Sequence, residues 1–344
     1  MIAAVLAPVI LAACEPVMVP AGQNAAPPRL TDDRYVAADG TALSLAQWPA
    51  ANGAAPKAVI LGLHGFGDYR NAFEDPAAIW SKDGIATYAY DQRGFGESPS
   101  RGRWPGTDTL VDDARAVATL LRQRYPGVPL YIAGESMGGA VALVAADRGI
   151  QADGLILLAP AVRTRKSLGE IATAGAWFFS HTVPWLPIGP TSIDFEPTDN
   201  PKTIEKLQKD PLMLRNPRVD MATSLLDLMD AAYAAAENVQ MPYMLLHGMA
   251  DLIVPSAPVR EAIKVLPPRP DSKLAFYQKG HHLLLRDKEG PKVSADVAAW
   301  MENHEAPLPS GADSKKVQPK MQALWGTGRP TDSRGEAATA IKGD

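Results

Sequence analysis

The sequence predicts an α/β protein with a mostly parallel central sheet flanked by helices. Apolar strand-like segments alternate with helix-like segments along most of the chain, which is the order typical of parallel sheets. The strand-like segments are near-continuous apolar runs, so both faces of the sheet are expected to be covered. A chain of 344 residues is also long enough to bury a large core.

The individual elements follow from local composition. Strands are predicted in the segments AVILGLHG (58–65), IATYAYD (85–91), LYIAG (130–134), GLILLAP (154–160), PYMLLHG (242–248) and KLAFYQKG (273–280). Helices are predicted in the segments 109–127, 140–146, 255–267 and 291–304. In the first of these helices Leu110, Ala114, Val117 and Leu121 share one face, and Pro126-Gly127 ends it.

Two regions depart from this alternation. Between about residues 161 and 238 the chain has helical patches, several aromatic residues and no convincing strand, which predicts a helical cap inserted into the sheet connectivity. Residues 304–344 are polar and rich in Lys, Gly and Ser, which predicts a disordered tail. The folded domain is therefore expected to span residues 31–303.

The amino terminus has the features of a bacterial lipoprotein signal. Residues 2–13 form an apolar run too short to span a bilayer, and the LAAC sequence that ends at Cys14 resembles a lipobox, in which the cysteine is lipidated. No Lys or Arg precedes the run, which leaves a buried or frayed apolar terminus as the alternative. We expect a signal peptide at 1–13, a linker at 14–30, and a lipid-anchored protein of the bacterial cell envelope, in the outer membrane.

Composition excludes several classes of protein. The net charge of −4 gives no basic surface of the kind that binds nucleic acid. With six histidines and one cysteine, the sequence has no Cys/His cluster for zinc, and a disulfide within the chain is impossible. The sequence does not indicate an oligomeric state.

The most specific motif is Gly-Glu-Ser-Met-Gly at residues 134–138. It joins a predicted buried strand to a small-residue helix, which is the context of a G-x-S-x-G nucleophile elbow. In such an elbow the turn is tight, the serine backbone is strained, and the two glycines let neighbouring elements approach closely. Ser136 is therefore the candidate nucleophile.

A serine nucleophile needs a base and an acid that orients the base. After an elbow these follow in the order acid then histidine. Asp251, just beyond the strand at 242–248, and the pair His281/His282, after the last strand, satisfy this order. His64 precedes the serine and is interpreted as a structural hydrogen-bonding residue. The two histidines cannot be distinguished by order alone.

These motifs resemble the α/β-hydrolase superfamily, and within it the monoglyceride lipase and lysophospholipase-like branch. The resemblance extends from Tyr35 to Met301 and rests on HGFGD, DQRGFGES (91–98), GESMGG, DPLMLR (210–215), HGMAD and GHHLLLRD. It implies that the catalytic histidine is His282, with Asp287 at the acidic position that follows. An oxyanion hole needs the backbone N–H of the residue after the nucleophile, Met137, and a second N–H from the loop after the strand at 58–65, from Gly65 or Phe66; the resemblance implies Phe66.

Glu135 departs from the histidine that animal monoglyceride lipases have before the serine. We consider two interpretations: a carboxylate paired with a nearby cation, or a negative charge that tunes His282. Ser98, in the other Gly-Glu-Ser sequence, lacks the second elbow glycine and is interpreted as a loop residue.

The expected function is hydrolysis of lipid carboxylic esters, monoacylglycerol or lysophospholipid, by Ser136, His282 and Asp251 without metal or organic cofactor. The partners are then the lipid ester and a membrane, reached through the anchor and, in one interpretation, also through cap aromatics such as Trp177 and Phe178. Alternatively, those aromatics pack the cap onto the core. An acyltransferase, a short-chain carboxylesterase and a non-catalytic lipid-binding lipoprotein remain as alternatives.

Overall fold

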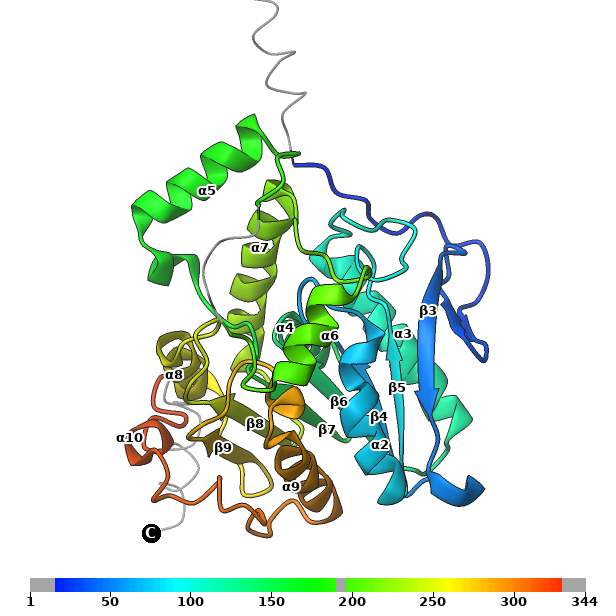
Figure 1. Ribbon diagram of the computed structural model, residues 1–344, viewed down its shortest axis with the longest axis vertical. Coiled ribbons are helices and arrows are strands. Elements are labelled where there is room, and N and C mark those ends of the chain that lie inside the picture. Colours follow the sequence, from blue (N-terminus) through cyan, green and yellow to red (C-terminus); the bar gives the residue numbers. More distant parts are fainter. Residues whose placement is uncertain (1–15, 190–195, 330–344) are drawn as a thin grey trace, which may run out of the picture.

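In this computed structural model the described residues are 16–189 and 196–329. They form one nine-stranded sheet with helices on both faces (Figure 1). The strands are β1 (Arg29–Leu30), β2 (Arg34–Val36), β3 (Ala42–Trp48), β4 (Ala58–Leu63), β5 (Ile85–Tyr90), β6 (Leu130–Glu135), β7 (Gly154–Leu158), β8 (Tyr243–Gly248) and β9 (Lys273–Tyr277).

The helices alternate with the strands from β4 onward. The α-helices are α2 (Glu74–Lys82), α3 (Thr107–Arg124), α4 (Met137–Asp147), α5 (Glu170–Thr182), α6 (Pro201–Lys209), α7 (Val219–Ala236), α8 (Ser256–Val265), α9 (Gly290–Glu302) and α10 (Pro319–Gln322). Short 3₁₀ turns are η1 (Ala51–Gly53), η2 (Arg70–Phe73), η3 (Arg165–Leu168) and η4 (Leu284–Arg286).

The strand order is β1-β2-β3-β5-β4-β6-β7-β8-β9. The six strands from β5 to β9 in this order are parallel, with Leu61 of β4 opposite both Tyr88 of β5 and Ile132 of β6. The first three strands are antiparallel and extend the sheet beyond β5. The predicted fold class is therefore confirmed, and three antiparallel strands are added to it.

Each central strand contributes to two cores, because successive side chains point to opposite faces. Ile60 belongs to the apolar cluster that contains Trp80 of α2 and Trp300 of α9, whereas its neighbour Leu61 belongs to the cluster that contains Val117 of α3. This double burial explains why the parallel strands read as continuous apolar runs.

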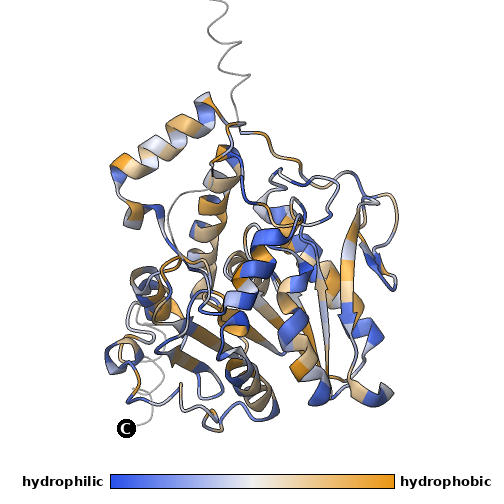
Figure 2. Ribbon diagram, in the orientation of Figure 1, coloured by the Kyte–Doolittle hydropathy of each residue, from blue (hydrophilic) through white to orange (hydrophobic). Residues whose placement is uncertain are grey.

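The insertion between β7 and β8 is helical, as the sequence predicts. It contains α5, α6 and α7, and α7 packs against α4 beside the sheet. Helix α5 contacts α7 but lies apart from the sheet, at the top of Figure 1. Several of its apolar residues, orange in Figure 2, are exposed. None of the helices in the described ranges combines the length and apolar character needed to cross a bilayer.

The predicted disordered tail is wrong for residues 304–329. Leu308, Ala312 and Met321 are buried, and the carbonyl of Ala312 accepts a hydrogen bond of 3.0 Å from the Phe276 N–H of β9. An edge strand exposes unpaired backbone groups, and this segment covers those of β9. Apolar residues spaced between the lysines and glycines drive this packing, which the overall polar composition conceals. Residues 330–344 lie outside the described part.

The predicted linker packs against the domain over residues 16–30, so the folded part begins before residue 31. Its backbone N–H groups bond to the domain at Val19–Trp104 (2.8 Å) and at Ala25–Ala38 (2.7 Å), and Arg29–Leu30 form β1. A proline-rich extended segment keeps enough backbone donors to pair with a neighbouring surface. The signal segment 1–13 and Cys14 lie outside the described residues.

Candidate active site

The functional residues predicted from the sequence gather where the parallel strands end. Ser136 follows β6, Asp251 follows β8, His282 follows β9 and Phe66 follows β4. Because these strands are parallel, their carboxyl ends lie along the same edge of the sheet, the usual place for sites in open α/β folds.

Ser136 has the strained backbone expected of a nucleophile elbow, with φ 53° and ψ −112°. Its N–H donates to the Leu158 carbonyl (2.9 Å), and its own carbonyl accepts from Ala161 (2.9 Å). These bonds to the end of β7 and to the residues just beyond it hold a conformation that an isolated serine would rarely adopt.

The two elbow glycines are required by close contacts. A Cβ at Gly138 would lie 1.9 Å from the Leu63 carbonyl oxygen, and a Cβ at Gly134 would lie 2.4 Å from the Gly138 oxygen. Helix α4 can therefore begin directly against β4 and β6 only because both positions lack a side chain. The sequence motif thus corresponds to a real steric constraint at the start of α4.

Asp251 and His282 form a buried pair. The Nδ1 atom of His282 lies 2.8 Å from Asp251 Oδ2, and both side chains are almost completely buried. The other Asp251 oxygen, Oδ1, accepts hydrogen bonds from the backbone N–H groups of Ile253 (2.8 Å) and Val254 (2.9 Å). The carboxylate is therefore fixed on one side and directed at the imidazole on the other.

The loops that carry this pair are joined by their backbones. The N–H of Met249 donates to the Tyr277 carbonyl (2.8 Å), and that of Ala250 donates to the Gly280 carbonyl (2.9 Å). A Cβ at Gly248 would lie 2.3 Å from the Gly280 oxygen. This close approach selects His282 to face Asp251, whereas the neighbouring His281 bonds through its N–H to Asp287 (2.7 Å).

The pairing of Ser136 with His282 stays a prediction. Among the hydrogen bonds of the described residues there is none between the Ser136 hydroxyl and the imidazole. Such bonds are often long before substrate binds. The backbone N–H groups of Phe66 and Met137 likewise donate to no other residue in the described part of the chain, so both are available to an oxyanion. A Cβ built at Gly65 would lie 3.5 Å from Ser136 Cβ, so the Phe66 loop passes beside the serine.

His64 is a structural residue, as the sequence suggests. Its Nε2 accepts the Gln92 N–H (2.9 Å), which leaves the proton on Nδ1 for the Gly65 carbonyl (2.8 Å). Burial lowers its pKa, which keeps the ring neutral. Ser98 is also a loop residue, since its Oγ accepts the Gly94 N–H (3.2 Å).

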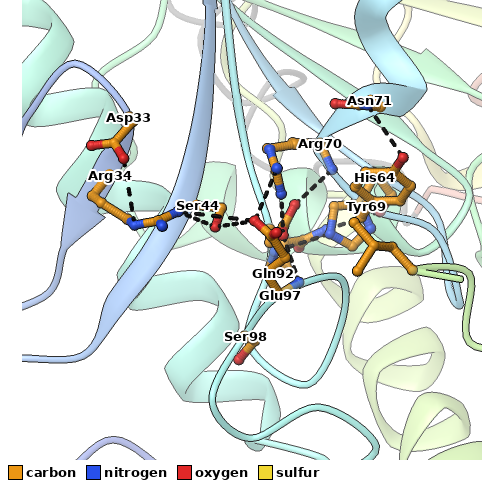
Figure 3. A network of polar contacts seen from close by, with 12 residues as sticks. Asp33, Arg34, Ser44, His64, Tyr69, Arg70, Asn71, Gln92, Glu97 and Ser98 are labelled. Carbon is orange, nitrogen blue, oxygen red and sulfur yellow. Dashed lines mark hydrogen bonds and ion pairs between the residues drawn. The ribbon is translucent and has the colours of Figure 1, made fainter.

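A polar network holds the loop after β5, which carries the DQRGFGES motif (Figure 3). Arg70 bonds to the carboxylate of Asp91 (2.6 Å), which also accepts the Glu97 N–H (2.8 Å). The Glu97 side chain bonds to Ser44 (2.7 Å) of β3 and pairs with Arg70 (3.0 Å). The DQRGFGES motif therefore fixes the loop after β5 against the start of η2.

Two carboxylates and one histidine lie close enough together to be considered for a metal. Donor atoms of Asp199, His281 and Asp287 are within 4.8 Å of one another. Asp287 already accepts the N–H groups of His281 (2.7 Å) and Asp199 (3.3 Å), and Asp199 accepts that of Lys288 (2.8 Å). Those bonds explain both carboxylates as loop-fixing groups.

His247 on β8 is a buried histidine to which the sequence assigns no role. Neither ring nitrogen has a hydrogen-bond partner among the described residues, and burial lowers its pKa to about 4. In the unfolded chain this histidine binds a proton near pH 6.5. Between that pH and about 4 only the unfolded state is protonated, so the free energy of unfolding falls as the pH drops through this interval.

We therefore expect His247 to cost the folded state about 2 kcal/mol between pH 7 and pH 5. Urea unfolding at both pH values measures this, with His247→Leu as the comparison. Between pH 7 and pH 5 the free energy of unfolding of His247→Leu should fall by about 2 kcal/mol less than that of the wild type. Equal pH dependence in both proteins would contradict the assignment.

Glu135, the residue before the nucleophile, is paired with a cation. Its Oε2 lies 2.6 Å from Nη2 of Arg286, which also lies 2.6 Å from Asp68 Oδ2. The first of the two interpretations of Glu135 therefore matches its surroundings. The roles of Arg286 and Asp68 could not be predicted from the sequence, because no local signal connects residues so far apart in the chain.

Comparison with known proteins agrees with this architecture. The profile of the serine aminopeptidase S33 family (Hydrolase_4) matches residues 54–289. Human monoglyceride lipase is 30% identical over 268 residues, which cover 76% of this chain and 86% of the relative. The monoacylglycerol lipase of Mycolicibacterium smegmatis is 23% identical, covering 72% and 89%.

Solved structures show the same fold. A soluble variant of monoglyceride lipase from Saccharomyces cerevisiae, in complex with a substrate analogue, has a TM-score of 0.67 at 20% identity, covering 85% of this chain and 99% of that one. The monoacylglycerol lipase of Paleococcus ferrophilus has a TM-score of 0.63 at 22% identity, covering 76% and 99%. The resemblance to monoglyceride-lipase-like α/β hydrolases is therefore confirmed, and the chain belongs to the serine aminopeptidase S33 (Hydrolase_4) family of hydrolases.

Proposed function

We propose that this protein is a serine hydrolase that cleaves monoacylglycerol, or the similar lysophospholipid, to a fatty acid and an alcohol. The observation that carries the proposal is the buried His282–Asp251 pair at 2.8 Å, on the sheet edge that also holds the strained Ser136. An imidazole oriented by a carboxylate near an elbow serine is the arrangement used for acyl transfer.

The proposed mechanism is a two-step acyl transfer through Ser136 and His282. With Asp251 holding the proton on Nδ1, His282 Nε2 accepts the Ser136 hydroxyl proton as Oγ attacks the ester carbonyl. The Phe66 and Met137 N–H groups stabilise the oxyanion. His282 then protonates the departing alcohol, and a water molecule repeats the sequence on the acyl-enzyme to release the fatty acid.

The substrate class rests on two kinds of support. The relatives named above are monoglyceride lipases, one of them 30% identical. In addition, α5 leaves its aromatic residues in solvent, with Trp177 62%, Phe178 55% and Phe179 54% exposed. Each of them is therefore more than half exposed rather than buried in the core. An exposed apolar surface on the cap suits a substrate that is delivered from a lipid aggregate.

We expect the aromatic surface of α5 to bind lipid. Replacing Trp177 and Phe178 together by Ser should lower binding to phosphatidylcholine vesicles about tenfold or more, since each ring buries a large apolar area in the interface. Co-sedimentation of unlipidated protein measures this, with hydrolysis of a soluble short-chain ester as the control. Unchanged vesicle binding would rule out this surface as the contact.

The proposal extends to the predicted lipid anchor at Cys14 and to residence in the bacterial cell envelope, in the outer membrane. It is supported by the LAAC sequence and the preceding apolar run. Mass spectrometry of the mature amino terminus tests it: a diacylglyceryl cysteine at position 14 is the expected result.

The substrate proposal is tested by measuring fatty-acid release from long-chain monoacylglycerol, lysophospholipid and short soluble esters. Preferred cleavage of long-chain monoacylglycerol is the expected result. Preference for short esters would instead identify a carboxylesterase, and acyl transfer to added alcohol in place of hydrolysis would identify an acyltransferase. Absence of both reactions would leave only lipid binding.

A further inference from the structure

A buried arginine joins three loops at the candidate active site. Arg286 is 6% exposed, and its Nη2 atom lies 2.6 Å from both Asp68 Oδ2 and Glu135 Oε2, which are equally buried. Asp68 belongs to the loop after β4 that carries Phe66, and Glu135 is the last residue of β6, directly before Ser136. One guanidinium therefore contacts the oxyanion loop and the nucleophile elbow at once.

Arg286 itself lies on the loop of the proposed base. It follows His282 by four residues and ends η4, the short turn Leu284–Arg286. Since the side chain reaches back to Asp68 and Glu135, the loop carrying the base is bound to the loops carrying the oxyanion donors and the nucleophile. The contacts span 218 and 151 residues of sequence.

The backbone of the same residue holds the cap. The Arg286 carbonyl accepts hydrogen bonds from Thr203 Oγ1 (3.0 Å), Thr198 Oγ1 (3.2 Å) and Asn200 Nδ2 (3.2 Å). These residues lie at and before the start of α6, in the cap. The cap is thereby attached to the very turn that positions the proposed base.

Stability alone is a poor explanation for this arrangement. Removing three charges from water is costly, and an apolar substitute for a buried ion pair is often equally stable. Burial raises the pKa of Glu135, although the charge of Arg286 acts to lower it. The guanidinium is thus the group that favours the charged form of Glu135 beside the catalytic edge.

That charge lies within electrostatic reach of His282. Asp251, from the β8 loop, bonds to this imidazole, and His247, on β8, and Glu135, on β6, interact with it electrostatically. Asp251 is part of the proposed mechanism and His247 is neutral. The charge on Glu135, balanced by Arg286, is therefore the variable contribution to the field at the base.

We propose that Arg286 is a positioning residue for the hydrolytic reaction: it fixes the His282 loop against the elbow and the oxyanion loop, and it offsets the charge of Glu135 and Asp68 near the base. The inference rests on the proposed function and deepens it. It gives the buried arginine an effect on the reaction rate, in addition to the roles of Ser136, His282 and Asp251.

The test is the pH dependence of kcat/KM for a soluble p-nitrophenyl ester. Arg286→Met should lower kcat/KM about 100-fold, since small displacements of reacting groups have effects of that size. It should also move the midpoint of the acidic limb upward by about one pH unit, because loss of a nearby positive charge favours the protonated imidazole. Arg286→Lys, which keeps the charge, should retain the wild-type midpoint.

A matched control is available in the same protein. Arg93 is also buried and also pairs with two carboxylates, Asp39 (2.8 Å) and Asp113 (2.7 Å), but none of the three belongs to the loops that carry the site residues. Arg93→Met is expected to lower stability without moving the acidic limb. A shift of equal size in this variant would show that the effect is not specific to Arg286, and would overturn the proposal.

Glu135→Gln keeps the proposal testable if Arg286→Met does not fold. Removing the carboxylate charge while retaining its shape should move the acidic limb downward by about half a pH unit. An unchanged midpoint in Glu135→Gln would overturn the proposal, as would wild-type kinetics in folded Arg286→Met. In either case an active wild-type enzyme would leave the proposed function standing. Failure of the wild type to hydrolyse the ester or to react with a fluorophosphonate would instead remove the proposed function itself.

Discussion

Replacement of Ser136 by alanine is expected to lower kcat/KM for ester hydrolysis by about 10⁴-fold or more. The variant removes the atom that forms the acyl-enzyme and leaves the surrounding structure intact, because the elbow is held by backbone bonds at the Ser136 N–H and carbonyl. Fatty-acid release from the substrate series measures the loss, and fluorophosphonate labelling should disappear with it.

Ser98 provides the matched control for this experiment. It lies in the chain's other Gly-Glu-Ser sequence and is buried, but its hydroxyl bonds only within its own loop, to Gly94 and Ser100. Ser98→Ala should cost about 1 kcal/mol of stability for the lost hydrogen bonds and keep near-wild-type activity. Retained hydrolysis in Ser136→Ala would mean that the elbow is only a turn and that another group is the nucleophile.

The central sheet could be predicted from the sequence because each parallel strand is buried on both faces. That environment produces runs such as AVILGLHG, which no loop or amphipathic helix resembles. The strands β1 to β3 could not be predicted in the same way. They are antiparallel and short or partly exposed, so a segment such as Ala42–Trp48 has no strong apolar run.

The packing of residues 304–329 could not be predicted from composition for a related reason. Average polarity measures the exposed majority of a segment, whereas a few apolar side chains decide whether it packs. Met321 contributes to the core near Tyr243, and Trp325 bonds to the Tyr243 hydroxyl. The sequence signal for this packing is therefore the spacing of large apolar residues such as Leu308, Met321 and Trp325, not the composition.

Within the site, local motifs and distant contacts differ in how far they can be predicted. The elbow is a local feature. Contacts between adjacent elements require its glycines and its serine, so five consecutive residues are enough to predict it. The order of acid and histidine indicated Asp251 and the pair His281/His282, and the family resemblance selected His282. No local sequence motif predicts the Arg286 network, because its partners become neighbours only after the sheet has formed.

Asp251→Asn is the second large expected loss, about 10³- to 10⁴-fold in kcat/KM. The hydrogen bonds of the two Asp251 oxygens explain this loss. Asp251 Oδ1 accepts two backbone N–H groups, from Ile253 and Val254, so the amide oxygen of asparagine must take that position. The amide NH₂ is then directed at Nδ1 of His282, in place of the oxygen that lies 2.8 Å away.

Two donors cannot share that contact, so the imidazole must place its proton on Nε2 and loses the lone pair that accepts the Ser136 proton. Fluorophosphonate labelling should slow in proportion to kcat/KM, because both reactions need the same proton transfer. Asp271→Asn, at a surface pair with Arg269 before β9, serves as the control and should label at the wild-type rate. If Asp251→Asn kept activity within tenfold of the wild type, Asp251 would only support the loop, and another group would have to orient His282.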